Sequence, residues 1–168
     1  NGASLARLLP RALTAGLTEL ARGEGTTFFS AAYAVLLELL HQRTGGSDIV
    51  LGTQMAARDD AELETIVGPF VNTLVHRNDL SNDPSFRELI TRVRTTALDA
   101  FAHQDAPFEV LVRELQLTRD TSRSPLFQVL FNVANKRAEA APLGDLVATY
   151  VPLQSVAGIR GHRRAVEG

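Results

Sequence analysis

Side chains that could do catalytic chemistry are few in this chain of 168 residues, which contains no cysteine and four histidines. No two histidines stand at the spacing of zinc ligands, so we expect no metal site. The lack of cysteine excludes a thiol nucleophile. The lack of a Gly-x-Ser-x-Gly pattern argues against a serine hydrolase, and the glycines form no phosphate-binding loop. The histidines are His41, His76, His103 and His162.

Three segments nevertheless combine turn-forming, aromatic and polar residues in a way that stands out from the rest of the chain. The first reads VGPFVNTL and spans Val67–Leu74, with Arg77 soon after it. The second reads HQDAPFE and spans His103–Glu109, and the third reads RDTSRSPLFQV and spans Arg119–Val129. Taken one at a time, each segment has a structural interpretation, which we favour from the residues alone.

In that interpretation, a Gly-Pro pair turns the chain into a strand on which Asn72 is a polar side chain. Asp105 caps the helix that Pro107 opens. Gln104 and Glu109 tie down the first turn of this helix. The third segment begins with an ion-pair cluster ahead of a strand, formed by Arg119, Asp120 and Arg123.

Composition restricts the class of protein further. Hydrophobic residues are 45% and charged residues 21%, which is ordinary for a globular domain and too apolar for a disordered chain. A net charge of −2 argues against a nucleic-acid binder. The longest apolar stretch, Phe28–Leu40, is shorter than the ~20 residues of a membrane-spanning helix. The chain has no initiator methionine and no signal core, so we expect a cytoplasmic segment of a longer protein.

The spacing of apolar residues predicts the elements that carry the three segments. We expect Gly23 to end the first helix and the pair Gly45 and Gly46 to end the second. Asp83 should cap the third helix, with Pro84 at its first position. Two helices, two strands, two helices and two strands are typical of an α/β fold in which helices cover a sheet. The expected helices span 13–23, 28–44, 84–101 and 108–117, with a short turn in 61–66, and the strands span 48–55, 70–80, 126–133 and 147–153.

Taken together, in this order and at this spacing, the three segments resemble the later signature motifs of the condensation domains of nonribosomal peptide synthetases. The stretch Thr44–Thr53 resembles the same family, and the resemblance runs from about Leu9 to about Asn135. It implies an α/β fold, a chloramphenicol-acetyltransferase-like two-layer sandwich lobe in which helices cover a mixed sheet. Residues 1–153 would form a partial C-terminal lobe, and residues 154–168 a disordered or aberrant tail.

The resemblance implies amide-bond formation, in which the amine of one carrier-bound thioester attacks a second thioester. Both substrates are held on phosphopantetheine arms of carrier proteins, so we expect no cofactor to bind the chain itself. The family's His-His-x-x-x-Asp-Gly loop belongs to the N-terminal lobe, which would be a further partner, and no His-His pair occurs here. We therefore expect no catalytic residue in this chain, no activity on its own, and no nucleic-acid or membrane partner.

Within this resemblance, we assign Asn72, Thr73 and His103 to the wall of the substrate channel. Asn72 is the expected polar contact because an amide both donates and accepts hydrogen bonds. For His103 we prefer a structural hydrogen bond beside the helix cap to a role as a base. The motif residues with structural roles are Gly68, Phe70, Gln104, Asp105, Pro107, Phe108, Glu109, Arg119, Asp120, Ser122, Arg123, Pro125 and Phe127.

Two alternatives stay open on the residues. One is an epimerisation or heterocyclisation domain of the same superfamily, and the other is a non-catalytic lobe that recruits another protein to the synthetase. The third segment resembles the condensing type more closely. The upstream loop would decide, because an intact His-His-x-x-x-Asp-Gly favours condensation, an Asp-x-x-x-x-Asp version favours cyclisation, and a damaged loop favours recruitment.

Overall fold

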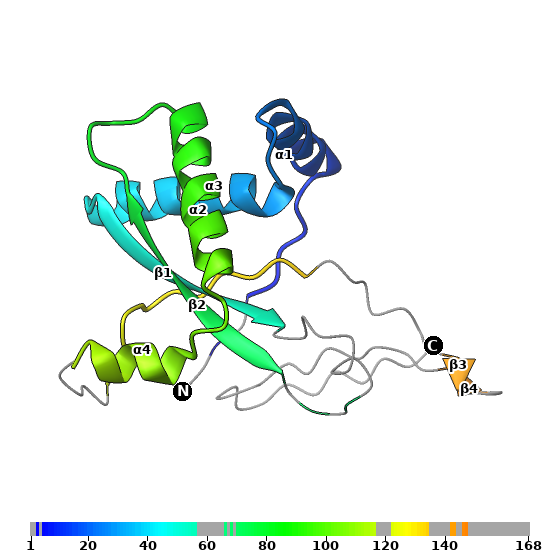
Figure 1. Cartoon of the computed structure of the whole chain (residues 1–168). Coiled ribbons are helices and arrows are strands. Elements are labelled where there is room, and N and C mark those ends of the chain that lie inside the picture. Colours follow the sequence, from blue (N-terminus) through cyan, green and yellow to red (C-terminus); the bar gives the residue numbers. More distant parts are fainter. Residues whose placement is uncertain are drawn as a thin grey trace, which may run out of the picture. The chain divides into compact units, whose positions relative to one another are not determined.

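The computed structural model describes residues 3, 5–56, 66, 68, 70–116, 122–134, 142–143 and 146–147. Contacts divide the chain into two compact units, one of residues 11–133 and one of residues 1–10 with 134–168. The second unit carries the short antiparallel pair β3 (Pro142–Leu143) and β4 (Leu146–Val147). The first unit carries, in chain order, α1 (Arg11–Gly23), α2 (Phe28–Thr44), β1 (Asp48–Ala56), β2 (Val71–Asp79), α3 (Phe86–Ala102) and α4 (Phe108–Glu114) (Figure 1).

The first two helices form a hairpin whose ends are set by turn residues. Leu17 and Leu20 of α1 pack against the core that α2 contributes to. The chain reverses at Gly25, whose φ of 61° is left-handed, so Gly25 rather than Gly23 makes this turn. Thr27 caps α2 by accepting a hydrogen bond from the backbone N–H of Ser30 (3.2 Å). Gly45, with a φ of 70°, ends α2 as the sequence predicts.

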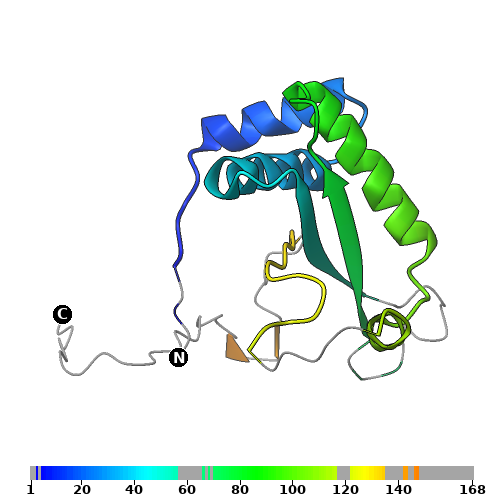
Figure 2. The same ribbon diagram turned by 90° about the vertical axis from the view of Figure 1, so that its left-hand side faces the viewer.

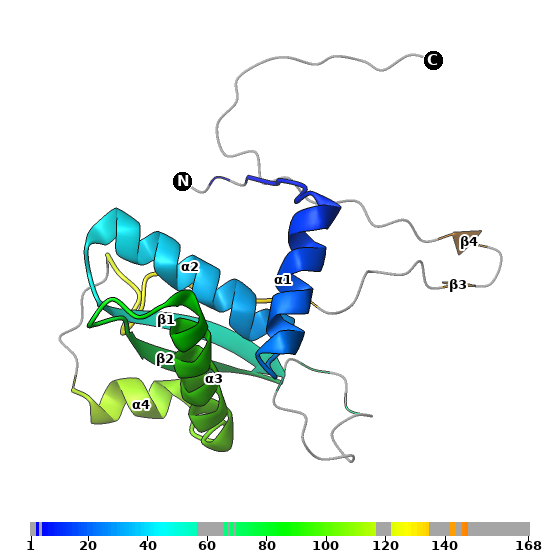
Figure 3. The ribbon, with the colours of Figure 1, turned by 90° about the horizontal axis from the view of Figure 1, so that it is seen from above.

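β1 and β2 pair antiparallel along their whole length, with Gly52 opposite Val75. Side chains alternate between the two faces of a strand, so Leu74, His76 and Asn78 share one face of β2. All three are buried. α3 packs against β2 and α2 contacts β1, so the helices lie on this sheet (Figure 2; Figure 3).

α3 begins two residues later than expected, because Ser85 and not Asp83 is its N-cap. The Ser85 hydroxyl accepts from the backbone N–H of Glu88 (3.4 Å), and the Glu88 carboxylate accepts from the backbone N–H of Ser85 (2.8 Å). Asp83 has a φ of 47° and lies in the turn before the helix, so the expected start at Asp83 and Pro84 is wrong. The inward face of α3 buries Leu89, Ile90, Val93 and Ala97.

The strand expected over 126–133 is wrong as a continuous strand. A single parallel bridge, between Gly52 and Leu130, joins this segment to β1 among the described residues. Leu126 has a φ of 69°, which is far from an extended conformation, so regular pairing cannot start there. Two other expected elements, the strand over 147–153 beyond Val147 and the helical turn in 61–66, fall almost wholly outside the described residues.

α4 ends at Glu114, three residues before the expected end at 117. Its N-cap is Pro107, which makes no side-chain cap hydrogen bond, so the cap expected at Asp105 is wrong. The start of this short helix therefore depends on a group from elsewhere in the fold.

The core of the first unit lies where α2 and α3 meet the sheet, and α1 packs on α2 at its side. Tyr33 and Leu37 of α2 are among its largest fully buried side chains. Within the part of the chain that the structure describes, no helix is long and apolar enough to cross a membrane. The cluster consists of Ala21, Ala31, Tyr33, Ala34, Leu37, Leu51, Leu80, Leu89, Ile90 and Val93.

Candidate functional site

Asn72 on β2 fastens the second signature segment to the sheet. Its side-chain Nδ2 donates to the carbonyl oxygens of Gln104 (2.6 Å) and Ala106 (2.9 Å). Its Oδ1 accepts from the backbone N–H groups of Thr73 (2.9 Å) and Phe108 (3.3 Å). Three of these bonds join residues 32 to 36 positions apart, so the fold and not the local sequence makes them.

The bond from Phe108 gives α4 the cap that Pro107 cannot provide. The first N–H groups of a helix have no partner within the helix. They are usually satisfied by the side chain of the N-cap residue itself. Here the acceptor is a side chain on a neighbouring strand, so β2 fixes the position at which α4 begins.

The third signature segment meets the second through an aromatic contact. The rings of Phe108 and Phe127 lie 5.7 Å apart between centroids. Phe127 is only 8% exposed, and its ring fills the space beside Gly52 where a Cβ would stand. Gly52 also binds this segment through its backbone, donating to the Val129 carbonyl (3.0 Å) and accepting from the Phe131 N–H (2.9 Å). The structure thus joins the three signature segments and β1 into one connected set.

His103 lies at the C-terminal end of α3 and is exposed. Its Nδ1 donates to the carbonyl oxygen of Asp99 (2.8 Å), because a carbonyl can only accept. This bond agrees with the preference for a structural hydrogen bond over a base. The channel-wall role assigned to Asn72, Thr73 and His103 stays a prediction.

The other residues predicted from the signature segments differ in how much the structure shows of them. Glu109 lies exposed in the first turn of α4, and the carbonyl of Pro125 accepts from the backbone N–H of Phe127 (2.9 Å). Gly68, Phe70, Ser122 and Arg123 are described, and each takes part in an interaction. The predicted ion-pair cluster stays untested because two of its members, Arg119 and Asp120, lie outside the described residues.

Beneath the helices, a buried polar cluster went unrecognised in the sequence. Three oxygens share the two N–H donors of Asn78 Nδ2, namely the Tyr33 hydroxyl, the Ile49 carbonyl and the His76 carbonyl, each at 3.1 Å. The His76 ring packs against those of Tyr33 and Phe101, at 5.6 and 6.5 Å between centroids. Burial raises the pKa of Tyr33 and lowers the pKa of His76, since both charged forms lose solvation. Among the described atoms, Nε2 of His76 has no hydrogen-bond partner.

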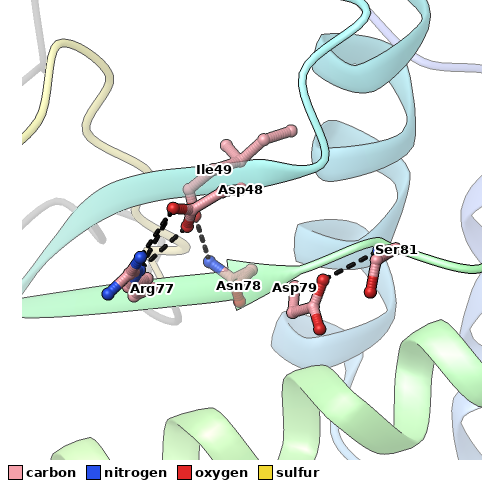
Figure 4. Close-up of polar contacts among 6 residues, drawn as sticks. All are labelled: Asp48, Ile49, Arg77, Asn78, Asp79 and Ser81. Atoms are coloured by element: carbon pink, nitrogen blue, oxygen red, sulfur yellow. Dashed lines mark hydrogen bonds and ion pairs between the residues drawn. The ribbon is translucent and has the colours of Figure 1, made fainter.

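An ion pair fixes the open end of the β1–β2 hairpin. Arg77, which follows the first signature segment, donates from Nε and Nη2 to the Asp48 carboxylate (2.9 and 2.8 Å; Figure 4). This bidentate contact lowers the pKa of Asp48 and raises the pKa of Arg77. Both side chains are mainly exposed, so the pair specifies strand register more than it stabilises the chain. Asp79 accepts from the Ser81 N–H (2.8 Å) at the adjoining turn (Figure 4).

A hollow of about 360 Å³ lies beside the first half of β1. Its walls are mostly apolar and come from the end of α2, from β1 and from the end of the third segment. In the ranges that the structure describes, no cluster of three or more histidine and carboxylate side chains could hold a metal ion. The lining includes Leu40, Ile49, Leu51, Leu126, Phe127 and Val129.

The geometry defines an α/β lobe in which three separate segments are joined at one sheet, and comparison with known proteins gives its family. A family model described as the condensation domain matches residues 2–154. A linear gramicidin synthase from Brevibacillus parabrevis is 52% identical over 130 residues, which cover 77% of this chain and 3% of that protein. The chain belongs to the condensation domain family.

Two solved structures share the fold. The holo form of AB3403, a four-domain nonribosomal peptide synthetase bound to AMP and glycine, aligns with a TM-score of 0.79 at 26% identity. The alignment covers 82% of this chain and 10% of that one. The X-domain from teicoplanin biosynthesis, solved with OxyB, aligns with a TM-score of 0.69 at 35% identity over 73% of this chain and 27% of that one. The predicted α/β, chloramphenicol-acetyltransferase-like fold is confirmed.

Proposed function

We propose that this chain forms part of the condensation domain of a nonribosomal peptide synthetase, and that the whole domain joins two carrier-bound substrates by an amide bond. The observation that carries the proposal is the family match across residues 2–154. The 52% identity to a linear gramicidin synthase supports it. These relatives do not favour the epimerisation, heterocyclisation or recruitment alternatives.

In the proposed reaction, the amine of one aminoacyl thioester attacks the carbonyl carbon of the other. A C–N bond forms and the C–S bond breaks, releasing the thiol of the donor's phosphopantetheine arm. Both reactants are tethered, so holding them in the right geometry supplies a large share of the rate. A channel wall of fixed shape contributes to this without a titrating residue of its own.

The proposal includes partners and a location. Carrier proteins bring the substrates on their phosphopantetheine arms, and the N-terminal lobe of the same domain supplies the histidine loop. Residues 1–153 act as the C-terminal lobe, Thr73 and His103 face the channel, and the reaction takes place in the cytoplasm. No cofactor binds the chain directly.

The test must supply the remainder of the domain, since the chain spans 3% of the linear gramicidin synthase and 10–27% of the two solved chains. Residues 2–154 would replace the matching part of the gramicidin synthase domain. Loaded donor and acceptor carriers would be added, and dipeptidyl thioester followed by mass spectrometry. We expect product from this hybrid domain and none above background from the 168-residue chain. A folded hybrid that binds both carriers without forming product contradicts the proposal.

A further inference from the structure

The bonding of Asn72 leaves its side chain no capacity for a further partner. An amide offers two N–H donors and an oxygen with two acceptor sites. Both donors are used by the carbonyls of Gln104 and Ala106, and both acceptor sites by the N–H groups of Thr73 and Phe108. A substrate that bound this amide would have to displace one of the four bonds.

The positions of these bonds show what Asn72 controls. Three of them reach the turn between α3 and α4, including the shortest, at 2.6 Å to Gln104. α4 has seven residues, which is too short for a helix to be stable without outside support. The ring of Phe108, the first residue of α4, packs against the ring of Phe127. A change at Asn72 therefore displaces the turn, then α4, and then the third signature segment.

We infer that Asn72 is a positioning residue, which acts on condensation by fixing the turn Gln104–Phe108 and not by touching the substrate. Its effect on the reaction rests on the proposed function, whereas the fixing of the turn rests on the structure alone. We propose this indirect role for Asn72 in place of the channel contact that the sequence predicts.

Hydrogen exchange on the 168-residue chain tests the fixing of the turn without any assay of activity. In Asn72→Ala, the Phe108 amide should exchange about tenfold faster or more, because it loses its acceptor. Amides in the β1–β2 ladder should change by less than about twofold. Gln42→Ala removes an exposed side-chain amide that is bonded to Glu38 on α2, and it should leave the turn unchanged. Unchanged exchange at Phe108, or equal acceleration along the whole chain, overturns the inference.

Kinetics of the hybrid domain test the effect on the reaction. Asn72→Ala should lower turnover per folded molecule about 10- to 100-fold while the apparent KM for the carriers changes less than about twofold. In a Phe108→Leu background the same substitution should cost about threefold or less, because the path through α4 is already broken. An equal factor in both backgrounds overturns the inference, since a direct substrate contact would act independently of Phe108.

The inference stays testable if Asn72→Ala does not fold or if the hybrid domain forms no product. If Asn72→Ala does not fold, Ala106→Gly loosens the same turn while Asn72 stays intact. Lower turnover in Ala106→Gly then supports the inference, and unchanged turnover overturns it. If the unmodified hybrid forms no product, the proposed function fails, and the exchange measurement still decides whether Asn72 fixes the turn.

Discussion

Replacing Gly52 by alanine tests how β1 and the third signature segment fit together. The added Cβ would stand 2.5 Å from Cε2 and Cζ of Phe127 and 2.8 Å from its Cε1. Real Cβ atoms essentially never come within 3.0 Å of another heavy atom, so the ring or the strand must move. The φ of Gly52 is not positive, so glycine is needed here for space and not for its backbone conformation.

The cost depends on what can move. Phe127 is 8% exposed and its ring contacts the ring of Phe108. Two backbone hydrogen bonds join Gly52 to Val129 and Phe131, so the strand cannot easily shift either. Overfilling a packed site costs about 1–3 kcal/mol. Alanine also restricts the unfolded chain, which offsets about 0.4–1 kcal/mol. We expect Gly52→Ala to lower the free energy of unfolding by about 1–2 kcal/mol.

Urea unfolding followed by circular dichroism measures this change, and Gly16→Ala is the matched control. Gly16 lies within α1, with nothing inside 4 Å of an added Cβ, so alanine there should stabilise the chain by about 0.5–1 kcal/mol. Phe127→Ala alone should cost about 3–5 kcal/mol. In that background Gly52→Ala should cost close to nothing, because the ring that it meets is gone.

Two results would refute this reasoning. One is a Gly52→Ala chain that unfolds at the same urea concentration as the unmodified chain. The other is an equal cost of Gly52→Ala with and without the Phe127 ring. Either result would mean that the ring is not held against β1.

Three further predictions concern the core and the helix caps. Burial lowers the pKa of His76, so the unfolded chain binds a proton that the folded chain excludes, and stability should fall as pH drops below about 6.5. His76→Phe should flatten this fall in urea midpoints between about pH 7 and 5, and an unaltered slope would contradict the assignment. Ser85→Ala should cost about 1 kcal/mol by removing the α3 cap, and an unchanged urea midpoint would show that α3 starts elsewhere. Tyr33→Phe should cost about 1 kcal/mol in the same assay, since Asn78 loses one of three acceptors, and no loss would mean that the bond contributes nothing.

Helix ends could be predicted wherever one residue's own backbone conformation decides them, as at Gly45. The start of α3 shows the limit of this approach. Asp83 followed by proline and Ser85 followed by Glu88 both look like helix starts in the sequence. Tertiary contacts decide between them, because Arg92 from α3 donates to the carbonyls of Asp79 and Ser81 (2.9 and 3.1 Å) and holds the preceding turn.

The signature segments could be found in the sequence, but their connection could not. Nothing local to Asn72 indicates that its partners stand 32 to 36 residues later. The apolar run after Leu126 favours a strand, yet the Phe127 ring packs over Gly52 and only one bridge forms among the described residues. The sequence did carry a pattern that could have revealed the buried cluster. His76 and Asn78 are two residues apart on one face of β2, and the residues between them, on the other face, are more exposed.

The support that α4 receives from β2 also determines when this helix can form. Nucleating a helix costs more than seven residues can recover by hydrogen bonding alone. Asn72 reaches Phe108 only after a loop of 36 residues has closed, and loop closure is opposed by chain entropy. We therefore expect the hairpin and α3 to form before α4 is helical. Substitutions in α4 should then change the unfolding rate and leave the folding rate almost unchanged. The rate measured by a spectroscopic probe on α4 would therefore report when the signature segments come together, and not when the core forms.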